Sequence, residues 1–118
     1  MKLSCNVAEV QRSLVPNVSI LTIDCSGGVS VKMDIHDEVN TVDKGDRILF
    51  TISKEVPKFE EGRDFVASGY VIKFKEEGDR RKMIVSLWGF VVIIESRNPD
   101  VFKEFRPMDK VYVKIAKL

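Results

Sequence analysis

The sequence predicts an all-β protein, a single antiparallel β-barrel of about eight strands within one domain, residues 1–118. Apolar and polar residues alternate with a period of two along most of the chain, which is typical of strands that bury one face. Turn-forming residues recur at intervals of about 8–15 residues, so the strands are short. We expect a barrel because closure leaves no strand edge open.

The alternation is clearest from Val29 to Ile35, and it returns at Tyr70, Ile72 and Phe74, which we assign to the interior. Pro, Asn and Gly mark the turns between strands. A helical turn is expected near residues 100–105, capped by Asn98, and a weaker one at residues 37–42. The predicted strands cover residues 2–12, 18–25, 29–36, 46–53, 66–76, 81–88, 90–96 and 110–117.

Composition restricts the class of protein. The chain is 44% apolar and 31% charged, with a net charge of +1, which is a globular balance without a signature of disorder. A nearly neutral charge disfavours an autonomous nucleic-acid binder, which usually carries a basic excess. No apolar run approaches the roughly 18 residues of a membrane span, and the N-terminus lacks the apolar core of a signal peptide. We therefore expect no membrane contact and a location inside the cell.

Few residues are candidates for chemistry. His36 stands alone, without the spacing of a metal site, and is expected to face solvent. Carboxylates are scattered from Asp34 to Asp46, either as a solvated edge or as a patch for a basic partner. We expect no catalytic residue, metal, cofactor or small-molecule substrate.

Cys5 and Cys25 are the only thiols. A hairpin centred near Val15 would place them opposite one another on neighbouring strands, with both side chains on one face. They would then be either two small buried side chains or, in a hyperthermophile, a disulfide.

A basic hairpin and its aromatic neighbours suggest a second kind of surface. Tyr70 and Phe74 lie near it and could stack on bases, but their phase favours the core. Acidic residues interrupt the basic ones, so a solvated hairpin is favoured over contact with a protein or a nucleic acid. The basic residues are Lys73, Lys75, Arg80, Arg81 and Lys82.

The segment around Trp88, Gly89 and Phe90 is apolar on both faces. A small barrel has one interior, so the second face needs a cover. The cover is either the connection 97–109, with Phe102 and Phe105 as lids, or a partner subunit. The candidate interface is Trp88, Gly89, Phe90 and Val92.

Three ordered segments of the second half support a family resemblance. They are Gly69-Tyr70-Val71, Val85-Ser86-Leu87-Trp88-Gly89-Phe90-Val91-Val92 and Met108-Asp109-Lys110-Val111-Tyr112-Val113-Lys114. With Leu3-Ser4-Cys5 and Asp24-Cys25-Ser26-Gly27, they resemble the eighth subunit shared by eukaryotic nuclear RNA polymerases and its counterpart, the G subunit of the archaeal DNA-directed RNA polymerase. The short stretch 56–64 favours the compact archaeal form, since eukaryotic members carry a longer insertion there.

The resemblance implies an OB-like barrel that docks on the largest polymerase subunit and does no chemistry itself. Its partners would be that subunit and the rest of the polymerase core, with DNA and RNA met only through the complex. The location would be the cytoplasm, or the nucleus if the source were eukaryotic. The alternative is a free-standing OB-like protein that binds single-stranded nucleic acid.

Overall fold

The structure, a computed structural model of the chain, describes residues 1–118 and contains one closed barrel of eight strands. Two short 3₁₀ turns lie between strands: η1 (Ser26–Gly28) follows the second strand, and η2 (Pro99–Phe102) follows the seventh. The strands are β1 (Lys2–Arg12), β2 (Val18–Cys25), β3 (Ser30–His36), β4 (Arg47–Ser53), β5 (Phe65–Glu77), β6 (Arg80–Leu87), β7 (Phe90–Ser96) and β8 (Lys110–Lys117).

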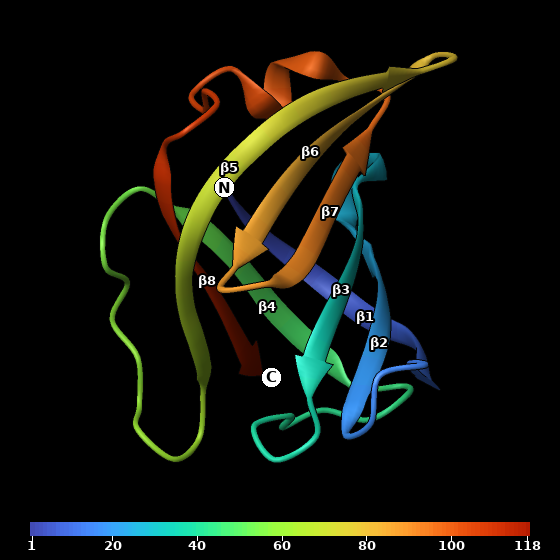
Figure 1. Cartoon of the computed structure of the whole chain (residues 1–118), viewed down its shortest axis with the longest axis vertical. Coiled ribbons are helices and arrows are strands. Elements are labelled where there is room, and N and C mark those ends of the chain that lie inside the picture. The colour runs from blue at the N-terminus through green and yellow to red at the C-terminus, as the bar shows by residue number, and fades with distance from the viewer.

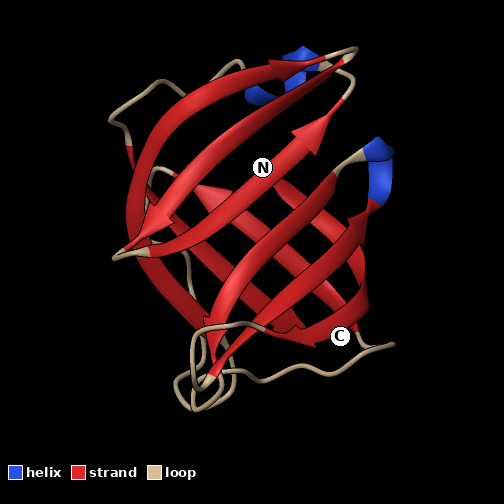
Figure 2. Cartoon of the chain, turned by 45° about the vertical axis from the view of Figure 1, so that its right-hand side comes forward, coloured by secondary structure: helices blue, strands red, loops and turns tan.

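Around the barrel the strands follow the order β1-β2-β3-β7-β6-β5-β8-β4, and every neighbouring pair is antiparallel. Figure 1 shows the long β5 curving along one side of the barrel beside the shorter hairpin of β6 and β7, and Figure 2 shows the closed wall of strands from a second direction. The predicted all-β fold with eight antiparallel strands is confirmed, and each predicted strand end lies within one residue of the observed one.

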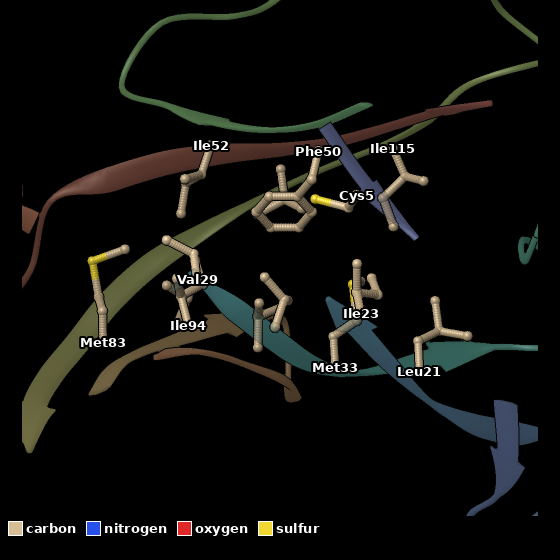
Figure 3. Packing of buried hydrophobic residues seen from close by; sticks show 14 of the residues in the cluster. Cys5, Leu21, Ile23, Val29, Met33, Phe50, Ile52, Met83, Ile94 and Ile115 are labelled. Carbon is tan, nitrogen blue, oxygen red and sulfur yellow. The ribbon is translucent and has the colours of Figure 1, made fainter. Parts of the chain in front are cut away.

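The interior is filled by the alternating apolar residues of all eight strands, which form one cluster of 23 buried residues. Phe50 is its largest fully buried side chain, and Figure 3 shows it beside Cys5 and opposite Met33 and Ile23. Burial of this apolar surface is the main source of stability, at about 25 cal/mol for each Å² removed from water.

The assignment of Tyr70 and Ile72 to the interior is wrong. Gly69 and Val71 face inward instead, and the ladder between β5 and β6 skips one residue between Val71 and Lys73. This bulge at Ile72 reverses the alternation, so Phe74 returns to the inner side. Tyr70 and Ile72 are left on the outer face with 43% and 45% of their surface exposed.

Two helical turns were expected in the connections between strands, and the structure contains only the one near residues 100–105. Asn98 caps η2 by accepting a hydrogen bond from the backbone N–H of Asp100, as predicted. The helical turn expected at residues 37–42 is wrong, because the chain forms only a turn closed by the Val39 N–H and the His36 carbonyl.

Cys5 and Cys25 form a disulfide between β1 and β2. They are directly opposite in the register, with Cα atoms 4.0 Å apart, so the predicted hairpin alignment is confirmed. The sequence left open two buried thiols or a disulfide, and the structure contains the disulfide.

Removal of this bridge is expected to lower the free energy of unfolding by about 3 kcal/mol, because it closes a loop of 20 residues in the unfolded chain. Thermal unfolding with and without a reductant measures the loss. The variant Cys25→Ala is the control, since its melting temperature should not respond to the reductant. Equal melting temperatures for the oxidised and reduced protein would contradict the expectation.

Candidate subunit interface

Trp88 and Gly89 form the tip of the hairpin between β6 and β7. Leu87 pairs with Phe90, so the loop contains two residues only. Their φ angles are +56° and +97°, and positive φ at both central residues is the requirement of a type I′ hairpin turn. The Ser86 hydroxyl accepts a hydrogen bond of 3.3 Å from the Gly89 N–H and helps to hold the turn.

Trp88 is an unfavourable choice for this position when the fold is considered alone. Such turns favour Asn, Asp or Gly at the first central residue, and a left-handed conformation costs an ordinary residue roughly 1–2 kcal/mol. Trp88 gains little in return from its own chain, since 83% of its surface is exposed. A strained and exposed aromatic at a turn is a feature that points to function.

Around this tip lies an apolar surface, which we call the outer apolar face. It covers the outside of β5, β6 and β7, where Ile84 and Ile93 are paired across the strands. Strand alternation turns these side chains away from buried neighbours such as Met83 and Ile94. The face consists of Tyr70, Ile72, Ile84, Trp88, Val91 and Ile93.

The chain itself does not cover this face. Phe102 and Phe105 belong to the buried core cluster, and the Phe102 ring meets Phe74 edge-on at 6.1 Å between centroids. Figure 1 shows η2 at the end of the barrel remote from the turn between β6 and β7. The connection 97–109 therefore closes one end of the barrel, and its predicted role as a lid on the second face is wrong.

The four predicted interface residues differ in how exposed they are. Trp88 and Gly89 lie at the exposed tip, and Phe90 is half-buried against the core. Val92 is fully buried in the barrel, so its side chain cannot contact a partner, and its inclusion is wrong. It shares the inward phase of Phe90, whereas Val91 between them faces out.

Sequence reasoning missed Tyr70, Ile72 and Val91 as surface residues. Val91 could have been found, because it is out of phase with Phe90 in a simple alternation. Tyr70 and Ile72 could not, since the bulge that turns them outward leaves no mark in the sequence.

No group of three His, Cys, Asp or Glu side chains is arranged to hold a metal ion. No helix in the structure is long and apolar enough to cross a membrane. His36 is half-buried at the end of β3, where its Nδ1 accepts a hydrogen bond from the Glu38 N–H.

The basic hairpin of β5 and β6 is largely neutralised by its own carboxylates. A hydrogen bond from Lys82 holds the pKa of Glu77 below its ordinary value, and the same bond raises the pKa of Lys82. The guanidinium of Arg81 also packs on the Phe74 ring, 4.5 Å from its centre. The other ion pairs here are Arg80 with Glu95, Arg81 with Glu76 and Arg97 with Asp79.

Comparison with known proteins identifies the family. The family model for the G subunit of DNA-directed RNA polymerase matches residues 1–118. The chain belongs to this family.

Subunit Rpo8 of the DNA-directed RNA polymerase of Sulfolobus acidocaldarius is 29% identical over 99% of this chain and 98% of its own. Its counterpart in Saccharolobus solfataricus is also 29% identical, over 98% and 91% of the two chains. The subunit is thus a non-catalytic part of an RNA polymerase complex, and its relatives are archaeal, as the short segment 56–64 indicated. A solved structure of the cytoplasmic molybdate-binding protein ModG covers 98% of this chain and 89% of its own at 10% identity and a TM-score of 0.40, from which we draw no argument.

If Trp88 strains its turn, the variant Trp88→Asn should unfold at a higher temperature than the parent subunit. Asn tolerates the left-handed conformation, so a gain of about 1 kcal/mol, or roughly 2–6 °C, is expected. Trp88→Ala is the control, because it removes the indole without adding a side chain that favours the left-handed conformation. Differential scanning calorimetry measures both variants, and equal melting temperatures for the two would show that the turn stores no strain.

Proposed function

We propose that the subunit acts in the cytoplasm as a structural component that docks on the largest polymerase subunit through the outer apolar face and supports assembly of the complex. The exposed Trp88 in its left-handed turn is the observation that supports this most strongly. A large ring held away from the core, at a cost to the fold, is suited to a pocket in another chain.

Continuity of the face with the hairpin tip adds support. Tyr70 is opposite Ser86 in the ladder, two residues before Trp88, and Ile84 pairs with Ile93 on the same side. The apolar residues of three strands therefore form one surface with an aromatic anchor at its edge. Interface cores combine apolar and aromatic residues, as the centre of this face does, and Lys73 and Lys32 flank its Ile84–Ile93 pair.

The alternative function, binding of free single-stranded nucleic acid, has weaker support. Phosphate contacts need available cations. Of the five basic residues of the hairpin, Arg80, Arg81 and Lys82 are paired with carboxylates, which leaves only Lys73 and Lys75 without an ion-pair partner. Tyr70 is exposed and could stack on a base, but its neighbours on the outer face are aliphatic.

The variant Trp88→Ala should lose affinity for the largest subunit by roughly thirty- to a thousandfold, the effect of removing a hot-spot aromatic worth about 2–4 kcal/mol. Co-purification at high salt measures this, because apolar contacts persist where ionic ones are screened. The isolated variant should melt close to the parent, since the indole has little contact with its own chain.

Phe90→Ala is the matched control for the same hairpin. Its ring packs on the core, so the variant should lower the stability of the isolated subunit by about 3 kcal/mol or more. Retention of full affinity by Trp88→Ala would exclude the tip as an anchor of docking.

The purified subunit should bind a labelled oligonucleotide of roughly 15 bases more weakly than about 10 µM at physiological salt. The expected cause is its net charge of +1 together with the paired basic residues. Fluorescence anisotropy provides the measurement. Sub-micromolar affinity would favour the nucleic-acid function over a purely structural one.

A further inference from the structure

The hairpin of β6 and β7 ends before the strands on either side of it, β5 and β3, come to their own ends. The ladder between β5 and β6 begins at Tyr70 and Ser86, so the segment Phe65–Gly69 pairs with β8 alone. On the other side, the ladder between β3 and β7 ends at Met33 and Val92. Figure 1 shows the tip of the hairpin ending partway along β5. Beyond this tip neither β5 nor β3 pairs with the hairpin, and we call this part of the barrel wall the opening.

This opening lies between β3 and β5, which are not neighbours in the barrel. Where β6 and β7 are present, β3 and β5 are three strand spacings apart, or about 14 Å. Beyond the hairpin tip the places of those two strands are vacant, and the last residues of β3 pair only with β2. The wall of the barrel therefore has space for added strands here.

The main-chain groups of β5 at this opening have no strand to bond. Val71 directs its N–H to the Asp109 carbonyl and its carbonyl to the Met108 N–H, both on the β8 side. Alternate residues of a strand direct these groups to the same side, so Val66 and Ser68 direct theirs the opposite way, toward the opening. Two N–H donors and two carbonyl acceptors are thus presented in strand geometry.

Behind this edge lies an apolar cavity of about 400 Å³. It is bounded by β5 on one side, by β3 on the other and by the hairpin tip at its end. A strand added to β5 would direct every second side chain into it, beside Phe65 and Ala67. Its apolar lining includes Ile35, Phe65, Ala67, Leu87, Trp88 and Phe90.

The polar side chains that line the cavity are two carboxylates and the imidazole of His36. The carboxylates are Asp34 and Asp64, and Asp37 and Glu38 follow directly after β3. Asp64 has a cation near it, since the Lys114 Nζ lies 3.8 Å from its carboxylate. The Asp34 carboxylate accepts a hydrogen bond of 3.4 Å from the Val91 N–H but has no ion-pair partner. The outward side of the opening thus favours a basic neighbour.

We propose that an extended segment of the polymerase subunit that covers the outer apolar face adds to β5 as a strand, bonded to Val66 and Ser68. Its inward side chains are apolar and fill the cavity, and at least one outward side chain is Lys or Arg and faces Asp34. This inference rests on the proposed docking, because the same partner packs against Trp88 at the hairpin tip. Main-chain bonds supply affinity in such strand addition, and the cavity selects the side chains.

The other occupants have less support. The chain's own segment 54–64 lies along the outside of β8, where the Lys58 carbonyl accepts a hydrogen bond of 2.6 Å from the Lys114 Nζ. A second copy of the subunit would bring two acidic rims together, which is unfavourable.

Hydrogen exchange tests the proposal on the intact subunit. The amides of Val66 and Ser68 should exchange freely in the isolated protein and at least about tenfold more slowly after assembly into the polymerase, because they become bonded. Mass spectrometry of peptides spanning 65–70 measures this. Unchanged exchange on assembly would overturn the proposal.

A substitution supplies the second test. Ser68→Pro removes an N–H that no strand of the barrel uses, so the lone subunit should melt within a few degrees of the parent. Its assembly should weaken at least about tenfold, since a main-chain bond is lost and the ring enters the place of the added strand. Ser68→Ala keeps the N–H and is the matched control, with assembly expected to be unchanged.

The outcomes separate the two proposals. Loss of assembly by Ser68→Pro but not by Ser68→Ala, with slowed exchange, supports strand addition. Full assembly by Ser68→Pro while Trp88→Ala is released overturns strand addition and leaves docking intact. If the parent subunit does not bind the largest subunit, docking itself fails. Concentration-dependent protection of residues 66–68 in the free subunit, with a dimer in light scattering, overturns the choice of partner. If Ser68→Pro does not fold, the exchange experiment decides.

Discussion

A close backbone approach at Gly69 determines how this barrel closes. A Cβ atom at that position would lie 1.9 Å from the Ser86 carbonyl oxygen, so only glycine lets β6 cross β5 there. Before Gly69 the strand β5 pairs with β8 alone, Tyr70 pairs with both β8 and β6, and the rest of β5 pairs with β6 alone. The bulge at Ile72 follows within three residues and turns Tyr70 and Ile72 outward. Closure, the opening and the outer apolar face thus all depend on the contact between β5 and β6.

The hairpin tip shows a conflict between folding and binding. Gly89 fits its positive φ, whereas Trp88 occupies the same region of backbone conformation with a bulky side chain. A two-residue turn between paired strands fixes the backbone at the tip, so the backbone that carries the aromatic side chain has little freedom to lose on binding. The turn that strains the free subunit therefore also holds Trp88 in position for binding.

Much of the fold follows from the sequence alone. Alternation located all eight strands. The symmetric spacing of Cys5 and Cys25 about Val15 gave the pairing of the two cysteines, although a register shift between Val7 and Glu9 moves the rest of that ladder by one residue. Both signals are local, because each depends on residues that are adjacent in the chain or joined by one tight turn.

The surface was harder to predict, because it depends on exceptions to alternation. Val92 was placed at the interface although simple alternation directs it inward with Phe90, so that error did not come from an exception. Tyr70 was placed inside because the bulge at Ile72 breaks the phase that it would otherwise share with Phe74. One extra residue in a ladder reverses every later side chain, and its presence is decided by contacts between strands. The opening beyond the hairpin tip is likewise a difference in the lengths of strands that meet only after folding.

A closed barrel with one short unpaired stretch of β5 explains how a strand edge can select its partner. Exposed strand edges pair readily with other chains, and proteins usually cover them, charge them or keep them short. Here closure leaves an edge of β5 with only two residues, Val66 and Ser68, directed outward, too short to bind a strand by its main chain alone. An acidic rim near Asp34 disfavours a second copy, and the cavity admits only a segment with apolar residues in the correct phase. Each of these three restrictions is weak alone, but a partner strand has to satisfy all of them at once, which limits the number of chains that fit.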